Sequence, residues 1–139
     1  WEPTEPGRRH YYGIHYAEST NGVDWVCRPG LCIPFADEHE YAFGRPSVIR
    51  LNDTYFMWFA HRATKEIDTY RIGFASSQDG RSWLRNDAAA GIDVSADGWD
   101  SEMICYPYVF EHRDHMYMLY NGNGYGKTGF GLAVMEKAA

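Results

Sequence analysis

Several features are missing from this sequence, and each absence excludes a class of protein. The chain has no run of about 18 apolar residues, so no membrane-spanning helix is predicted. No stretch is rich in Lys and Arg, and the net charge is −6. Because nucleic-acid binding depends on a basic surface, we expect neither a nucleic acid nor a membrane among the partners. Helical periodicity is also absent, since the one Ala-rich stretch, 87–91, is too short to be stable alone.

Cysteine is scarce as well. There are three, an odd number that argues against a complete disulfide framework: Cys27, Cys32 and Cys105. The first two could pair, but reduced thiols are the expectation. No spacing of Cys and His matches a zinc site, and His112 and His115 flank a predicted turn where solvated side chains are expected. We therefore predict no metal and no cofactor. No signal peptide is recognisable, which favours a cytoplasmic protein. The sequence begins at Trp1 without an initiator Met, so the true N-terminus could be missing.

Aromatic residues, in contrast, are abundant. They make up 17% of the sequence, and 11 of them are Tyr. Tyr and Trp pack as hydrophobic side chains and keep a polar group available for hydrogen bonding. Two interpretations follow: these rings form the core of a β-sheet protein, or some of them stack on the apolar faces of sugars.

An internal repeat organises the chain. Residues 14–25 and 72–83 share one pattern, in which an apolar residue, an aromatic residue and Ala precede Ser-x-Asn/Asp-Gly-x-x-Trp. Ala75 lies 58 residues after Ala17, and Ala133, in a partial third copy, lies 58 residues after Ala75. Internal periods of this kind are typical of repeat architectures.

A second element repeats with a spacing of 61 residues, measured from Pro46 to Pro107. Each proline stands at the start of a strand-like segment, a position that tolerates the missing N–H. Each segment is followed by a polar turn and then by an aromatic run, 55–59 in one copy and 116–120 in the other.

The local chemistry of these repeats predicts strands, because Val, Ile, Tyr, Phe and Trp gather in short runs. Asn21-Gly22 and Asp79-Gly80 predict tight hairpin turns, since these residue types accept a positive φ. We interpret Asn21, Asp79, Trp25 and Trp83 as structural. The side chain of the Asn or Asp is predicted to tie each turn, and the two tryptophans are predicted to pack between neighbouring sheets.

The repeat unit is therefore predicted to be a four-stranded antiparallel meander, and the fold an all-β part of a β-propeller with about two and a half blades. The chain is predicted to be a single partial domain, 1–139. It would contain the outer strands of one blade at about 11–35, a complete blade at about 44–98 and a third blade at about 104–136.

These motifs resemble the five-bladed β-propeller glycosidases, the arabinanase-, invertase- and levansucrase-like enzymes of glycoside hydrolase families 43 and 32. The resemblance is carried by the Ser-x-Asn/Asp-Gly-x-x-Trp turns, by 45–48 and by 99–102 leading into Tyr106-Pro107. It implies a central channel lined by the first strand of each blade, with a carbohydrate site at its mouth and carboxyl groups from three blades. Where that family often has an Asp before the proline, this sequence has Arg45. The family's acid Glu also stands closer to a proline than Glu102 stands to Pro107.

Glu102 and Asp100 are the candidate catalytic residues. Glycoside cleavage needs one carboxylic acid to protonate the leaving oxygen and a second carboxylate to attack or to activate water. Desolvation among Trp99 and Tyr106 would favour the protonated form of Glu102. Alternatively, Glu102 is a surface carboxylate on a connecting loop, and Asp100 caps the turn after Gly98.

Seven further residues are predicted to contact a saccharide at the same mouth: Arg45, His61, Arg62, Tyr106, Asn121, Asn123 and Tyr125. A guanidinium can bind a carboxylate or two sugar hydroxyls, although an ion pair between Arg45 and Glu102 is an equal alternative. The Gly-rich segment 120–126 either contacts hydroxyl-rich ligands or needs glycine only for its backbone. It lacks the Gly-Lys-Ser/Thr sequence of a phosphate-binding loop.

Two functions are compatible with these residues. The first is a glycoside hydrolase or transglycosidase, and the second is a non-catalytic propeller module that binds a glycan or a protein. Nine predicted strands are about half of a five-bladed ring. Because a half-ring exposes apolar faces and unpaired edges, we expect the chain either to belong to a longer polypeptide or to form a homo-oligomer, at least a dimer.

Overall fold

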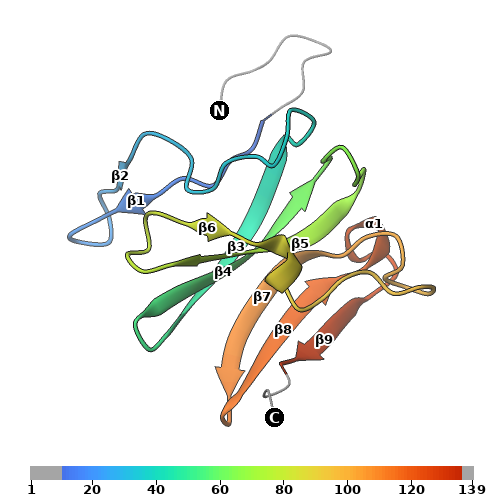
Figure 1. Ribbon diagram of the computed structural model, residues 1–139. Helices are drawn as coiled ribbons and strands as arrows, with labels where there is room; N and C mark the ends of the chain where they lie inside the picture. The colour runs from blue at the N-terminus through green and yellow to red at the C-terminus, as the bar shows by residue number, and fades with distance from the viewer. Residues whose placement is uncertain (1–10, 136–139) are drawn as a thin grey trace.

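The computed structural model describes residues 11–135, and in this range the chain is almost entirely β (Figure 1). A two-stranded sheet contains β1 (Ala17–Glu18) and β2 (Val26–Cys27). A four-stranded sheet contains β3 (Ala42–Leu51), β4 (Thr54–Arg62), β5 (Tyr70–Ser77) and β6 (Leu84–Arg85). A three-stranded sheet contains β7 (Cys105–His112), β8 (His115–Asn121) and β9 (Phe130–Val134). The predicted all-β class is confirmed, and the antiparallel meanders are those of a partial propeller.

Helical structure within residues 11–135 is limited to two short segments. A 3₁₀ turn, η1 (Asp87–Ala89), lies in the Ala-rich stretch, and α1 (Asn123–Gly126) lies in the Gly-rich segment. Two residues of α1, Gly124 and Tyr125, have left-handed φ/ψ values, so α1 is a turn rather than a regular helix. No helix of the described residues is long and apolar enough to cross a membrane.

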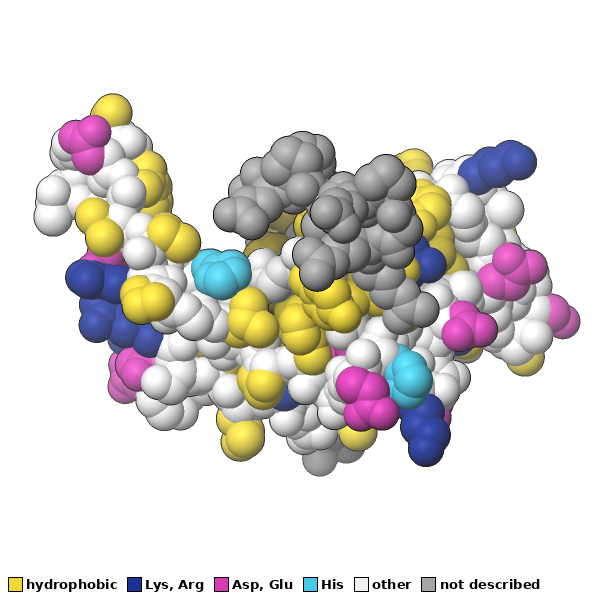
Figure 2. All heavy atoms as spheres, turned by 90° about the horizontal axis from the view of Figure 1, so that it is seen from above, with side chains coloured by type: hydrophobic (Ala, Val, Ile, Leu, Met, Phe, Trp, Pro, Cys, Tyr) yellow, Lys and Arg dark blue, Asp and Glu magenta, His cyan; other side chains and the backbone are white. Residues whose placement is uncertain are grey.

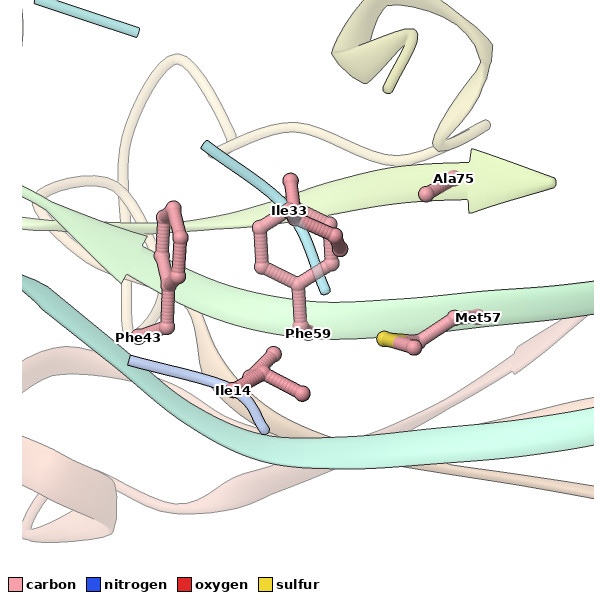
Figure 3. Close-up of a cluster of buried hydrophobic side chains, with 6 residues drawn as sticks. All are labelled: Ile14, Ile33, Phe43, Met57, Phe59 and Ala75. Carbon is pink, nitrogen blue, oxygen red and sulfur yellow. The ribbon is translucent and has the colours of Figure 1, made fainter. Parts of the chain in front are cut away.

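The strand β4 is apolar along nearly its whole length because both of its faces are covered. Met57 and Phe59 face the N-terminal segment, whereas Trp58 faces the three-stranded sheet. The first face completes a cluster that Figure 3 shows in close-up: Ile14, Ile33, Phe43, Met57, Phe59 and Ala75. The second face completes a cluster between the two larger sheets: Trp58, Ile72, Ala90, Ile104, Val109 and Met118. A central strand covered on both faces favours a continuous apolar run over strict alternation.

The two strands that contain the proline motifs, β3 and β7, are bent in the same way, and both begin before the proline that was predicted to start them. In each, one extra residue is inserted opposite the neighbouring strand, between Gly44 and Ser47 in β3 and between Cys105 and Tyr108 in β7. The residue before each proline has a positive φ, 52° at Arg45 and 57° at Tyr106. A β-bulge re-aims the side chains beside it. The two strands therefore present Arg45 and Tyr106 from equivalent backbone positions.

The loops predicted as tight hairpins are longer than two residues. In the loop between β1 and β2, the Asn21 side-chain oxygen accepts the backbone N–H groups of Val23 and Asp24. In the loop between β5 and β6, Asp79 accepts the corresponding N–H groups of Arg81 and Ser82, which lowers its pKa to about 2. In each of these two loops, the glycine after the Asn or Asp has a positive φ, and the Asn or Asp itself does not. The prediction of a two-residue tight turn was therefore wrong, whereas the prediction that the side chain of the Asn or Asp ties each turn is confirmed.

The prediction that both repeated tryptophans pack between sheets holds for one of them. Trp83 is partly buried and packs against the cluster around Phe59, whereas Trp25 is 63% exposed. Each indole N–H donates to the carbonyl of the glycine three residues earlier, so the local turn is the same and only the packing differs.

We expect Trp83→Ala to lower the free energy of unfolding by about 2 to 3 kcal/mol, less than the roughly 3 to 5 kcal/mol of a fully buried Trp. The matched substitution Trp25→Ala removes a side chain in an equivalent turn and should cost under about 1 kcal/mol. Urea denaturation of both variants tests this. Equal losses would show that the burial of Trp83 contributes nothing.

The outer face of the three-stranded sheet is apolar and uncovered within residues 11–135. It exposes four large side chains, Tyr108, Phe130, Leu132 and Val134. The last residue of the predicted third unit, 136, lies outside the described residues, and the assignment of the three sheets to blades stays a prediction.

Candidate carbohydrate site

One end of the molecule gathers most of the predicted site residues. The strands β3, β5 and β7 begin there, and β4 and β8 end there; in Figure 1 the ends of β3, β4 and β5 lie in the upper part and those of β7 and β8 lie lower, near α1. Figure 2 looks down on this end, where hydrophobic side chains, a class that includes Tyr, gather near the middle of the face. The site is therefore built from strand termini of two sheets, and the register of the strands determines which side chains lie next to one another there.

The guanidinium of Arg62, at the end of β4, lies among tyrosines. Its central carbon is 5.4 Å from the ring centre of Tyr41 and 5.2 Å from that of Tyr70. One terminal nitrogen donates a hydrogen bond of 3.3 Å to the hydroxyl of Tyr125 in α1. Both ring distances are within the range of cation–π attraction, so the tyrosines hold the cation in place.

A second cation, Arg45, extends this arrangement across to β7. Its guanidinium carbon is 5.8 Å from the ring centre of Tyr106. The Tyr106 ring lies 6.3 Å from the Tyr125 ring and 6.1 Å from the Tyr70 ring. Arg45 is exposed and has no carboxylate of the described residues within ion-pair distance, so the alternative of an ion pair with Glu102 is not what the structure shows. We call the six residues the Arg–Tyr site: Tyr41, Arg45, Arg62, Tyr70, Tyr106 and Tyr125.

Two tyrosines of the Arg–Tyr site, Tyr70 and Tyr106, are neutral hydrogen-bonding groups. Burial raises the pKa of Tyr70, and neighbouring Tyr106 adds to the effect. Burial likewise raises the pKa of Tyr106, with a further contribution from Cys105. Both hydroxyls thus keep their protons well above neutral pH. They can donate to a ligand oxygen, and their rings offer flat apolar surfaces.

Glu102 lies in the loop before β7 with a fixed backbone and an unengaged carboxylate. Its N–H donates to the side-chain oxygen of Asn123, and its carbonyl accepts from Thr69 and Arg71. The carboxylate itself makes no hydrogen bond or ion pair with a described residue. The side chain is exposed, so within residues 11–135 it is not enclosed by Trp99 and Tyr106 as expected.

The two predicted asparagines, Asn121 and Asn123, make hydrogen bonds to the backbone of the loops that form the site. Asn123 is 8% exposed, accepts the N–H groups of Glu102 and Met103, and donates to the carbonyl of Gly98. It therefore joins the loop before β7 to the Gly-rich segment. Asn121 donates to the backbone carbonyl of Tyr125 and so helps to fix that residue's left-handed conformation.

His61 is buried and lies apart from the surface of the Arg–Tyr site. It is 3% exposed, and its Nδ1 lies 2.9 Å from Oε1 of Glu40. Arg85 binds Glu40 through two nitrogens, at 2.7 and 2.9 Å, and also pairs with Asp87 at 2.7 Å. Burial opposes ionisation of Glu40, but the hydrogen bonds from Arg85 and His61 outweigh it and lower its pKa to about 2. We call Glu40, His61, Arg85 and Asp87 the buried ion network.

Asp100 is also buried rather than exposed at the site. It is 5% exposed and accepts a 3.0 Å hydrogen bond from the hydroxyl of Tyr120. Burial and this bond raise the pKa of Tyr120 to about 12. The carboxylate of Asp100 accepts no backbone N–H of the described residues, so the predicted cap of the turn after Gly98 is not made. The hydroxyl of Ser101 donates to the carbonyl of Gly98. The structure therefore does not bring the two candidate carboxylates to one surface.

Five residues that shape this region were not predicted from the sequence: Tyr41, Tyr70, Glu40, Arg85 and Asp87. The two tyrosines stand beside strand boundaries, and a search for aromatic residues adjoining Arg62 in the predicted hairpin would have found Tyr70, its partner across β4 and β5. The three charged residues carry no motif. Among residues 11–135, no group of three or more His, Cys, Asp or Glu is arranged to hold a metal ion.

Comparison of the sequence with known proteins finds relatives whose function is uncharacterized. No protein-family model matches the sequence. Two uncharacterized proteins of Mycobacterium tuberculosis, MT1551 of strain CDC 1551 and Rv1502 of strain H37Rv, are each 48% identical over 123 residues, which is 88% of this chain. The chain spans about 40% of the length of these curated relatives.

Two solved structures share the fold. A protein described as a glycoside hydrolase matches with a TM-score of 0.69 and 19% identity, over 88% of this chain and 35% of its own. A second structure, described as a complex of BT0996 with RGII, matches with a TM-score of 0.65 and 20% identity, over 85% of this chain and 33% of its own. The fold is therefore glycoside hydrolase-like.

Proposed function

We propose that the Arg–Tyr site binds a carbohydrate and that the chain is part of a glycoside hydrolase-like β-propeller. The observation that carries this proposal is the arrangement of four tyrosines and two arginines at one end of two neighbouring sheets. Such a surface combines flat apolar rings with hydroxyl and guanidinium donors. Sugars present the complementary groups, apolar ring faces and a rim of hydroxyl oxygens.

Catalysis is the second part of the proposal, with Glu102 as the general acid. Its backbone is held by three hydrogen bonds while its carboxylate stays available. A second carboxylate would come from another part of the polypeptide, because Asp100 is buried against Tyr120. The alternative is a non-catalytic glycan-binding module, and the absence of an acid at Arg45, before Pro46, favours it.

Tyr125→Ala in the full-length protein is expected to weaken saccharide binding at least about tenfold, which corresponds to ~1.4 kcal/mol. Tyr125 is half-exposed, stacks on Tyr106 and orients Arg62, so its loss removes a contact surface and frees a cation. A glycan array followed by titration calorimetry on the best-bound oligosaccharide measures the effect.

Tyr108→Ala is the matched control, because Tyr108 is also exposed and lies on β7 beyond the proline. It should bind as the unchanged protein does. If no oligosaccharide binds, or if the two variants behave alike, the proposed carbohydrate site is wrong.

A further inference from the structure

The arginines of the Arg–Tyr site differ from most of the others in the described chain. Five arginines have a carboxylate within ion-pair distance: Arg28, Arg50, Arg71, Arg81 and Arg85. Arg45 and Arg62 have none among residues 11–135, although the protein is acidic, with a net charge of −6. Two cations beside one tyrosine cluster thus have no negative partner within the described range.

Arg62 also uses few of its hydrogen-bond donors. A guanidinium carries five N–H groups, and the structure gives this one a single hydrogen bond, to the hydroxyl of Tyr125. Its Nε is buried and has no hydrogen-bond partner in the part of the chain that the structure describes. The two tyrosine rings beside the guanidinium and the burial of its Nε shield part of the cation from water, which strengthens its attraction for an anion.

A neutral sugar would leave this positive charge uncompensated. Hydrogen bonds between a guanidinium and an anionic oxygen are roughly twice as strong as neutral ones, and the planar fork matches a carboxylate or a phosphate. The neighbouring hydroxyls of Tyr70 and Tyr106 keep their protons, because burial raises the pKa of each, so they donate to an anion and do not repel it.

We propose that the Arg–Tyr site selects saccharides that carry an anionic group, a carboxylate or a phosphate ester. This inference rests on the proposed carbohydrate site and adds its ligand class. The two arginines act as specificity residues: Arg62 is held in place by Tyr41, Tyr70 and Tyr125. Arg45 reaches the same cluster from the β3 bulge.

The test compares matched saccharides on the full-length protein by titration calorimetry. Trimers of galacturonic, glucuronic and mannuronic acid are each paired with the neutral hexose trimer of the same linkage, and hexose 6-phosphates are paired with the free hexoses. We expect the anionic member of at least one pair to bind about tenfold or more tightly, a difference of ~1.4 kcal/mol. The advantage should shrink as salt is raised from about 0.05 to 0.5 M, because ions screen exposed charges.

Variants then assign the preference to residues. Arg62→Met and Arg45→Met should reduce the anionic advantage, which is the ratio of the two affinities, to less than about threefold, because each substitution costs the anionic trimer more affinity than it costs the neutral trimer. Arg50→Met, which removes an exposed arginine at the opposite end of β3, should leave the advantage intact. Arg45 is exposed, so its variant keeps the test decisive even if Arg62→Met fails to fold.

The outcomes separate this inference from the proposal beneath it. Equal binding of neutral and anionic partners would overturn the anionic preference and leave the carbohydrate site standing. A preference that survives both arginine substitutions would overturn the role of the Arg–Tyr site. Binding of neither class would overturn both.

Discussion

Arg85→Met is expected to lower the free energy of unfolding by about 3 to 5 kcal/mol, the usual cost of removing one partner from a buried ion pair. Arg85 has a 12% exposed side chain, and it neutralises Glu40, whose side chain is fully buried. Without the guanidinium, the Glu40 carboxylate would keep only His61 and the N–H of Ala36 as partners. Chemical denaturation of the full-length protein measures the loss.

Arg81→Met is the control for this substitution. Arg81 also pairs with a glutamate, Glu18, at 2.9 Å, but its side chain is 60% exposed. Exposed ion pairs contribute about 0 to 1 kcal/mol, so the change should be small. A loss at Arg85 no larger than at Arg81 would contradict the structural importance of the buried ion network.

The same network predicts an acid sensitivity. The pKa of Glu40 falls from an ordinary value of 4.5 to about 2 in the folded protein. A group whose folded pKa is depressed stabilises the fold above its unfolded pKa, and this stabilisation is lost as the pH falls through the folded value. Stability should therefore decline between about pH 4.5 and pH 2 in the unchanged protein, and less steeply in Glu40→Gln, because the titrating carboxyl is gone.

Glu102→Gln is expected to lower kcat by about two orders of magnitude or more in the full-length protein, if the proposed glycosidase activity is present, since general acids contribute about 10² to 10⁴ in rate. The amide cannot donate a proton to the leaving oxygen but preserves shape. The backbone hydrogen bonds of residue 102 stay in place, so the melting temperature should not change.

Glu111→Gln is the matched control for catalysis. Glu111 is an exposed carboxylate near the other end of β7, remote from the strand starts that form the site. Release of the aryl alcohol from aryl glycosides measures kcat for both variants, and Glu111→Gln should keep full activity. A fully active Glu102→Gln protein would contradict the assignment, and a loss in both variants would point to an effect on net charge.

The fold class was predictable because its signals are local. Short β-branched and aromatic runs, the proline within each bulge and the Asx-Gly turns all lie within a few residues of the structure that they cause. Burial was less predictable. Trp25 and Trp83 occupy equivalent turns, yet only Trp83 packs against a core. The cluster that Trp83 contacts contains Ile14 of the N-terminal segment, which lies far from Trp83 in the sequence.

The site was predictable only in part. Arg45, Arg62, Tyr106 and Tyr125 were singled out by strand ends, and the structure brings them together. His61 and Asp100 were also placed at strand or loop ends, but they point inward to Glu40 and Tyr120. Adjacent residues of a strand face opposite sides, so His61 and Arg62 diverge, and the sequence does not say which side is covered.

The left-handed backbone conformation of the residue before each proline restricts which side chains the Arg–Tyr site can contain at that position. A left-handed φ disfavours most side chains but suits Asp and Asn, whose short polar groups bond locally. An aspartate could therefore replace Arg45 without rebuilding the strand, and with less backbone strain than the arginine. The same bulged backbone can therefore carry either a cation that binds a ligand or a carboxylate that takes part in catalysis, and the two differ by a single substitution at position 45.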